Sequence, residues 1–219
     1  MMILNIKGRL GMAEDYFHIA SKIAPKWNLF PALKVGDTVK TGDFNPFFNF
    51  FLSSNLPTEN VNVDGAVTQW SWMKFLAGIR FGTMNTSMGV QDIATRGHYL
   101  AMHFCKYTRE LIWESVRATH YPDKPSRQKC LWVCRGVDNL EYWKPHLNDK
   151  KDDLLVYRVE LNGVIHEASD EHLMKDDMPY QEAVLMAHRY WKGEIANPLA
   201  KETLFEGDMK ILEQMNQPS

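Results

Sequence analysis

Short apolar runs predict strands early, in the middle and late in the chain. The expected strands are residues 16–20, a stretch that follows the Gly36-Asp37 bend, residues 130–134, 154–161 and 203–212. Asn162-Gly163 is a strong turn signal and is expected to end the strand at 154–161. Gly207-Asp208 is expected to break the last strand.

Apolar residues at helical spacing predict the longest helix over 89–120. Its expected inner stripe consists of Ile93, Leu100, Phe104, Leu111 and Val116. Glu110, Glu114 and Arg117 are spaced for the outside of that helix. Pro122 is expected to end it, because proline disfavours helix at the preceding residue.

Two shorter helices follow in the second half of the chain. Asp138 is expected to cap one that runs to Leu147. Another starts around 176–179, and Gly193 is expected to stop it. Its apolar face consists of Ala183, Met186, Ala187 and Tyr190.

The region before the long helix is harder to assign. Residues 45–56 are rich in phenylalanine and predict a short helix or a loop packed on the core. Residues 57–67 indicate an exposed loop or the edge of a hairpin, and 66–81 have helical spacing through Trp70, Met73, Ala77 and Arg80. Pro25 to Pro31 is expected to be a loop that carries Trp27.

The order of these elements predicts an α+β fold, because helices are inserted between strands without regular βαβ alternation. Residues 1–14 are expected to be a flexible lead-in, and 15–215 a single domain. The 219 residues are 45% hydrophobic and 24% charged, which is typical of a globular protein and argues against disorder.

The composition also indicates in which cellular compartment the protein is expected. No apolar run approaches the ~20 residues of a membrane helix, and the first residues lack the apolar core of a secretion signal. The three cysteines form neither a disulfide framework nor a zinc motif, so we expect a cytoplasmic protein without a metal site. The net charge of -2 gives no general attraction to nucleic acid.

Phosphate-binding loops, zinc helices and nucleophile elbows are absent from the sequence. Three segments contain side chains that could bind a ligand or take part in catalysis, and each also has a purely structural explanation. His18 on the first strand is suited to donate a hydrogen bond from a ring nitrogen to a ribose hydroxyl, or is a half-buried structural histidine. Ser126 and Arg127 follow a stiff Pro-x-x-Pro turn and suit a pyrophosphate, or form a plain connector. Glu202 starts the last strand and points into a cleft, or is a charged strand end.

Together these segments resemble the ADP-ribosyltransferase superfamily, in its His-Tyr-Glu branch. The Tyr16-Phe17-His18 strand and Leu33-Lys34-Val35-Gly36-Asp37 are similar to the first-strand region of the rifampicin-modifying type. Residues 202–212 resemble the strand that bears the catalytic glutamate. The Pro-Ser-Arg turn and the Tyr190-Trp191-Lys192-Gly193 helix end resemble an uncharacterised bacterial family that we associate with this fold. The resemblance leaves 44–90 without a counterpart.

The resemblance implies a split β-sheet core with inserted helices and an enzyme that consumes NAD+ as a substrate. Glu202 would then be the catalytic residue that stabilises the oxocarbenium-like ribose. The NAD-binding set would be His18 on a ribose, Ser126 and Arg127 on the phosphates, and Trp132 or a neighbour in place of the family's tyrosine. The resemblance requires no metal.

The acceptor of ADP-ribose is expected to be a nucleic acid or a protein. Lys124, Lys129 and Arg135 cluster in sequence near the expected site and suit phosphate contacts, although such a cluster is also typical of a solvated basic face. Small bacterial or phage transferases of this kind act as toxins, as effectors or in phage defence, with an antitoxin as a partner in some cases. An antibiotic-like small molecule is an alternative acceptor. Two other classes remain open: a non-catalytic module that binds NAD or ADP-ribose, and an interaction protein with the aromatic residues of 44–51 as its surface.

Overall fold

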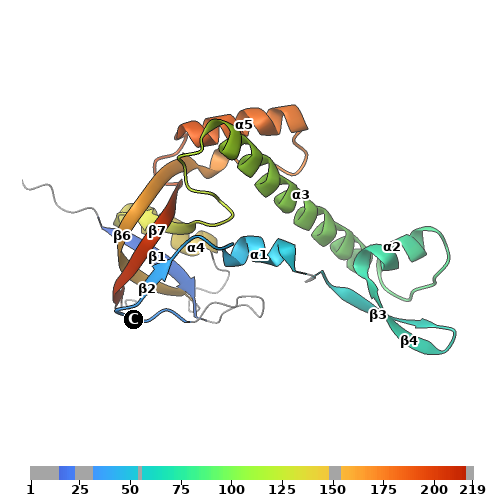
Figure 1. Ribbon diagram of the computed structural model, residues 1–219. Helices are drawn as coiled ribbons and strands as arrows, with labels where there is room; N and C mark the ends of the chain where they lie inside the picture. The colour runs from blue at the N-terminus through green and yellow to red at the C-terminus, as the bar shows by residue number, and fades with distance from the viewer. Residues whose placement is uncertain (1–14, 23–31, 54–55, 148–153, 216–219) are drawn as a thin grey trace, which may run out of the picture.

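The computed structural model of the protein describes residues 15–22, 32–53, 56–147 and 154–215. The expected lead-in at 1–14 and the Trp27 loop lie outside these residues. Within them the chain forms a single α+β domain with five α-helices and two antiparallel sheets (Figure 1). The α+β class expected from the sequence is confirmed.

The main sheet closes on itself to form a small barrel. Its strands are β1 (Tyr16–Ser21), β2 (Thr38–Lys40), β5 (Leu131–Arg135), β6 (Leu154–Ser169) and β7 (Lys201–Met215). The strand order is β2-β7-β5-β1-β6, and β6 pairs again with β7, which closes the ring. All of these pairs are antiparallel, and β2 extends the edge of β7 beyond β5.

Two glycines let β6 and β7 pair along the whole length of β7. Gly163 lies opposite Gly207 in the register. A Cβ atom on Gly163 would lie 2.2 Å from the carbonyl oxygen of Glu206, and one on Gly207 would lie 2.3 Å from that of Asn162. The expected turn at Asn162-Gly163 and the expected break at Gly207-Asp208 are therefore wrong. Here the glycines permit a close backbone approach inside a strand pair.

Alternate residues of the barrel strands divide between an inner and an outer face. The inner cluster consists of Val133, Tyr157, Val159, Phe205, Met209 and Ile211. The outer face is covered by helices in two places. Helix α4 (Val137–Leu147) covers a cluster of Phe17, Cys134, Leu140 and Val156.

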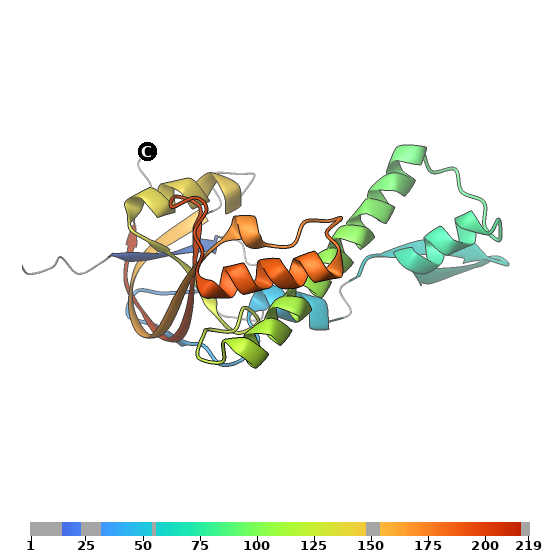
Figure 2. The same ribbon diagram turned by 90° about the horizontal axis from the view of Figure 1, so that it is seen from above.

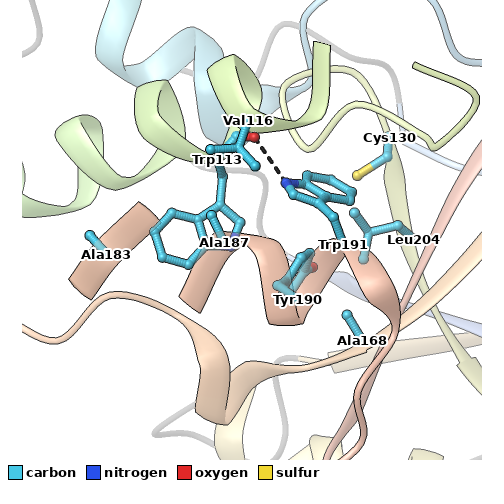
Figure 3. Packing of buried hydrophobic residues seen from close by; sticks show 9 residues of the cluster. All are labelled: Trp113, Val116, Cys130, Ala168, Ala183, Ala187, Tyr190, Trp191 and Leu204. Carbon is cyan, nitrogen blue, oxygen red and sulfur yellow. Dashed lines mark hydrogen bonds between the residues drawn. The ribbon is translucent and has the colours of Figure 1, made fainter. Parts of the chain in front are cut away.

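The second outer cluster lies between β7 and the helices α3 (Val90–His120) and α5 (Tyr180–Lys192). Figure 3 shows its side chains: Trp113, Val116, Cys130, Ala168, Ala183, Ala187, Tyr190, Trp191 and Leu204. The indole nitrogen of Trp191 donates a hydrogen bond to the carbonyl oxygen of Trp113 at 2.9 Å, which ties α5 to α3.

The helices of this half begin and end largely as expected. Gly193 ends α5 in a left-handed conformation with φ 76°, and the expected apolar face of α5 is buried at Ala183, Ala187 and Tyr190. The expected cap at Asp138 is wrong, because α4 already begins at Val137. Gly136, with φ 80°, turns the chain directly from β5 into this helix.

Helix α3 has the expected span but a different inner face. Its buried residues are Leu100, Glu110, Trp113 and Val116, whereas Phe104 and Leu111 are exposed. The expected outward position of Glu110 is therefore wrong. The large indole of Trp113 fixes the buried stripe, and Glu110 lies one turn before it on the same face.

The remaining elements form an arm that extends away from the barrel (Figures 1 and 2). The arm consists of the hairpin β3 (Thr58–Val63) and β4 (Ala66–Ser71), helix α2 (Trp72–Arg80), and the first half of α3, residues 90–106. Of the two alternatives for 57–67, the hairpin is confirmed. The helical interpretation of 66–71 is wrong, because these residues pair with β3 around a tight turn.

Helix α1 (Pro46–Leu52) links the barrel to the arm, and it confirms the short-helix alternative for 45–56. Asn45 caps it by accepting a hydrogen bond from the backbone of Phe48, which is buried. The ring of Phe51 stacks on Tyr107 of α3 at 5.4 Å. The aromatic side chains of α1 therefore pack within the molecule for the most part.

No helix of the described residues is both long and apolar enough to cross a membrane, and this includes α3 with its 31 residues.

Candidate functional site

The barrel places the three segments of the expected site on neighbouring strands. In the ring, β5 lies between β1 and β7. Trp132 of β5 is opposite Leu204 of β7, and Glu202 is two residues along β7 on the same face. That face is the outer one, towards α3 and α5. The structure therefore brings Trp132 and Glu202 together, although they are far apart in sequence.

The pairing between β1 and β5 is short. Only Tyr16↔Arg135 and Phe17↔Cys134 are paired, and we call the unpaired stretch beyond them, residues 18–21 beside 131–133, the split. Across the split, Nδ1 of His18 lies 2.9 Å from the carbonyl oxygen of Trp132. This leaves the facing edges of β1 and β5 without a continuous ladder beside Trp132.

The hydrogen bond of His18 fixes its tautomer. A carbonyl oxygen only accepts, so Nδ1–H is the donor, and burial lowers the pKa of the ring, which keeps it neutral. Nε2 is then an acceptor. The sequence-based expectation had His18 donating to a ribose hydroxyl, whereas this tautomer accepts a hydrogen bond at Nε2. His18 also lies opposite Tyr157 of the inner cluster, so it approaches the split from the inner face and Glu202 is on the outer face.

Arg127 is the centre of a buried network under α3 and α5. Its Nε and Nη2 donate to the two carboxylate oxygens of Glu110 at 2.9 and 3.2 Å. Its Nη1 donates to Oε2 of Glu202 at 2.7 Å and contacts the hydroxyl of Tyr190. Arg127 and Glu110 are 2% and 0% exposed, so this network is shielded from water. The guanidinium is thus bound to the protein's own carboxylates, a different use from the expected pyrophosphate contact.

The charges of this network stabilise one another. Burial alone would raise the pKa of Glu110, but Arg127 and Arg109 hold it below its ordinary value. Burial alone would lower the pKa of Arg127, but Glu110, Tyr190 and Glu202 raise it above its ordinary value. Burial also raises the pKa of Tyr190, so its hydroxyl stays protonated and donates.

The carboxylate of Glu202 is held by one oxygen. Its Oε2 accepts hydrogen bonds from Arg127 and from the hydroxyl of Tyr190, both at 2.7 Å. Within the described part of the chain, Oε1 has no hydrogen-bond partner. The side chain is 12% exposed, whereas that of Arg127 is 2% exposed. Glu202 is therefore an oriented carboxylate at the boundary of the buried network.

Ser126 is held in the connector before β5. Its backbone nitrogen donates to Oε2 of Glu206, and its hydroxyl donates to Oε2 of Glu114, both at 2.9 Å. Arg117 braces the same connector, because it pairs with Glu114 and donates to the carbonyl oxygen of Lys124. Both polar groups of Ser126 therefore have partners within the protein, and the residue is 4% exposed.

Trp132 is only partly buried and has two aromatic or cationic neighbours. The ring of Phe47 is perpendicular to it at 6.0 Å, and the guanidinium of Arg127 lies 5.5 Å from its ring centre. These contacts join α1 to the site and leave part of the indole accessible beside the split.

The whole of this arrangement falls within one family. The profile of a protein family described as "Protein of unknown function (DUF2441)" matches residues 16–217. The chain belongs to the DUF2441 family. No curated protein matches it. Because the match begins with β1 and extends beyond β7, it includes the barrel, the arm and the Arg127 network.

The three basic residues expected on the acceptor side are separated in this DUF2441 chain. Lys124 and Lys129 lie in the connector before β5, both partly buried. Arg135 is at the other end of β5, where it pairs with Glu167 at 3.2 Å. A strand of five residues separates them by roughly 13 Å. They therefore do not form one compact basic patch.

Three residues of the network, Glu110, Glu114 and Tyr190, had no site role in the sequence-based interpretation. Glu110 and Glu114 were expected on the outside of α3, and Tyr190 only as part of an apolar face. Trp113 could have revealed Glu110, because a buried stripe of α3 that passes through this tryptophan also includes Glu110. Within the described residues, no group of three His, Cys, Asp or Glu side chains is arranged to hold a metal ion.

Proposed function

We propose that this chain is a mono-ADP-ribosyltransferase that cleaves NAD+ and transfers ADP-ribose to a protein or nucleic acid. The observation that supports the proposal is the oriented carboxylate of Glu202. Arg127 and Tyr190 hold one of its oxygens and leave the other without a partner among the described residues. A partly exposed Trp132 lies on the same face, beside the split between β1 and β5.

In the proposed reaction, the bond between nicotinamide and C1′ of its ribose breaks, and its electron pair leaves with nicotinamide. Positive charge develops on the ribose, and the negative Glu202 stabilises it while Oε1 accepts a hydrogen bond from the 2′-hydroxyl. A nucleophilic atom of the acceptor forms the new bond to C1′ and loses its proton to the carboxylate or to solvent. Trp132 would stack on the nicotinamide ring.

The network gives Arg127 a positioning role in this proposal. Because it binds Glu110 and Glu202, we assign the pyrophosphate contact to Lys129 of the same connector. The amine of Lys129 has no carboxylate partner among the described residues, and it lies 5.9 Å from the ring centre of Phe44. His18 would accept a hydrogen bond from the adenosine ribose across the split, at Nε2.

Nicotinamide release by the purified full-length chain tests the proposal. We expect Glu202→Gln to lower turnover about 100-fold or more while NAD+ still binds. The amide oxygen can still accept from Arg127 and Tyr190, but the charge is lost and the NH2 group cannot accept from the 2′-hydroxyl. Glu206→Gln is the matched control, since Glu206 is on the same face of β7 and also accepts a hydrogen bond, from Ser126. If the native chain neither binds NAD+ nor releases nicotinamide, the transferase proposal is wrong.

The class of acceptor follows from the same assay with labelled NAD+ and a bacterial lysate. Label lost to protease indicates a protein acceptor, and label lost to nuclease indicates a nucleic acid.

The toxin role makes a separate prediction: expression of the native chain arrests bacterial growth, and Glu202→Gln relieves the arrest. Growth that is unchanged by expression of the native chain would count against a toxin that acts on the host tested.

A second candidate is a non-catalytic module that binds NAD or ADP-ribose. The ion pair between Arg127 and Glu202 favours it, because each side chain neutralises the other inside a buried network. This module would bind NAD+ equally well with glutamate or glutamine at 202 and would release no nicotinamide in either form.

A further inference from the structure

The hairpin of the arm is a sheet of only two strands. Six residue pairs join β3 to β4, from Thr58↔Ser71 to Val63↔Ala66, and no third strand of the described residues pairs with either. Helix α2 packs on one face of the hairpin. A two-stranded hairpin gains stability when more strands are added, so each free edge is a place for a partner strand.

The tight turn of the hairpin determines which backbone groups face the free edges. Asp64 and Gly65 both have positive φ, at 52° and 84°, which is the two-residue hairpin turn with Asp-Gly. The residues that flank such a turn, Val63 and Ala66, form a hydrogen-bonded pair, and bonded and non-bonded pairs then alternate. On β4, the backbone N–H and C=O groups that point outward and stay free therefore belong to Val67 and Gln69, because the next such residue, Ser71, caps helix α2.

The edge of β4 lacks the features that keep edge strands of monomers apart. Its sequence, Ala-Val-Thr-Gln-Trp-Ser, contains no charge and no proline, and its register with β3 has no bulge. Every residue except Trp70 is exposed, and Val67 is 72% exposed. Valine, threonine and tryptophan also favour strands. The opposite edge, on β3, offers two asparagines instead, a residue type that strands disfavour.

We propose that the β4 edge pairs antiparallel with the same edge of a second copy of this chain. The two hairpins then form one four-stranded sheet across a two-fold axis. An antiparallel strand that meets its own copy is the arrangement that two-fold symmetry produces. The uncharged sequence of β4 fits this occupant, because residues near the two-fold axis lie beside their own copies, where like charges would repel. This proposal is independent of the proposed transferase activity.

The mass of the full-length chain in solution, measured by sedimentation across about a hundred-fold range of concentration, tests the proposal. We expect a dimer, and Gln69→Pro should weaken it by at least about 10-fold, since proline removes the outward N–H in both copies. The hairpin itself should tolerate this change, because the N–H of Gln69 does not bond to β3.

Asn60→Pro is the matched control. Asn60 lies opposite Gln69 in the hairpin, and its N–H points to the other edge. We expect it to leave the dimer intact, and circular dichroism of both variants establishes that they fold. A native chain that is monomeric throughout the range overturns the proposal. A dimer that Gln69→Pro leaves unchanged also overturns it, and loss of the dimer only in Asn60→Pro would assign the interface to β3 instead.

Discussion

The two halves of α3 show how differently one helix is used in the barrel and in the arm. In the half next to the barrel, Glu110, Trp113 and Val116 are buried, and the charge of Glu110 is matched by Arg127. In the half that belongs to the arm, Leu100 is buried, whereas Val90, Tyr99 and Phe104 are exposed. The barrel half therefore buries charge, and the arm half exposes apolar surface.

This difference suggests a different role for each half of the helix. Glu110 of the barrel half pairs with Arg127 of the connector, and Arg127 in turn binds Glu202 of β7 and the hydroxyl of Tyr190 of α5. All of these partners must be present, so the geometry is fixed within one chain. The arm is held by α2 and by partly exposed pairs such as Arg96–Glu59, and its hairpin keeps free edges. The first arrangement suits a site with fixed geometry, and the second suits a contact with another molecule.

The largest expected effect comes from removing one ion pair in each half of α3: Glu110–Arg127 next to the barrel and Glu59–Arg96 in the arm. Glu110→Ala leaves the buried Arg127 without its bidentate partner, and we expect the free energy of unfolding to fall by about 3–5 kcal/mol. Glu59→Ala removes the arm's pair, in which Glu59 is 26% exposed, and we expect a loss of about 0–1 kcal/mol. Urea denaturation of both variants measures the difference. Equal losses would contradict the contrast between the two halves.

The next effect is a pH dependence that belongs to the barrel, through His166 of β6. Burial lowers the pKa of His166 to about 4, although its hydrogen bond to the carbonyl oxygen of Tyr190 opposes the shift. The unfolded chain takes up this proton near pH 6.5 and the folded chain only near pH 4, so stability falls as the pH falls between these values. The difference corresponds to roughly 3 kcal/mol.

Denaturation at pH 7 and pH 4.5 checks this prediction. His166→Gln should lose less stability between the two pH values than the native chain does. Burial also lowers the pKa of His18 and His188, so part of the pH dependence should remain in the variant. An unchanged dependence in His166→Gln would show that another group is responsible.

The smallest effect compares two glycines. Gly163→Ala places a Cβ atom 2.2 Å from a carbonyl oxygen in the barrel, and we expect a loss of about 1–3 kcal/mol. Gly65 in the arm has φ 84° and open space around it, so Gly65→Ala should cost about 1 kcal/mol from backbone strain alone. Gly65→Asn should recover part of the arm's loss, because asparagine tolerates this conformation. Thermal unfolding of the three variants tests the ranking.

Local patterns predicted the parts of the fold that local physics decides. The short apolar run at β5 and the long helical stripe of α3 were sufficient for the type and approximate span of both elements. The Asn162-Gly163 signal failed because a turn signal describes only its own residues. The pairing of Gly163 with Gly207 joins positions far apart in the chain and overrides the local preference.

The sequence was sufficient to single out several residues of the candidate site, but not the partners that they contact. His18, Arg127 and Glu202 were singled out from local chemistry and Trp132 from the family resemblance, and the structure places them on β5, on the connector before it and on its two neighbouring strands. Their partners were not predictable, because Arg127 binds residues 17 and 75 positions away in the chain. Glu110 was misplaced for a simpler reason, since the stripe of α3 was drawn through Leu111 instead of Trp113.

The place of β7 in the barrel has a consequence for synthesis on the ribosome. Residues 201–215 pair with β2, β5 and β6, all of which are made earlier. The ring cannot close on a nascent chain that lacks them, and long-range strand pairing of this kind forms slowly. Glu202 belongs to the same segment. The proposed catalytic carboxylate is therefore synthesised together with the strand that completes the barrel, and a translation product that ends before residue 201 has neither.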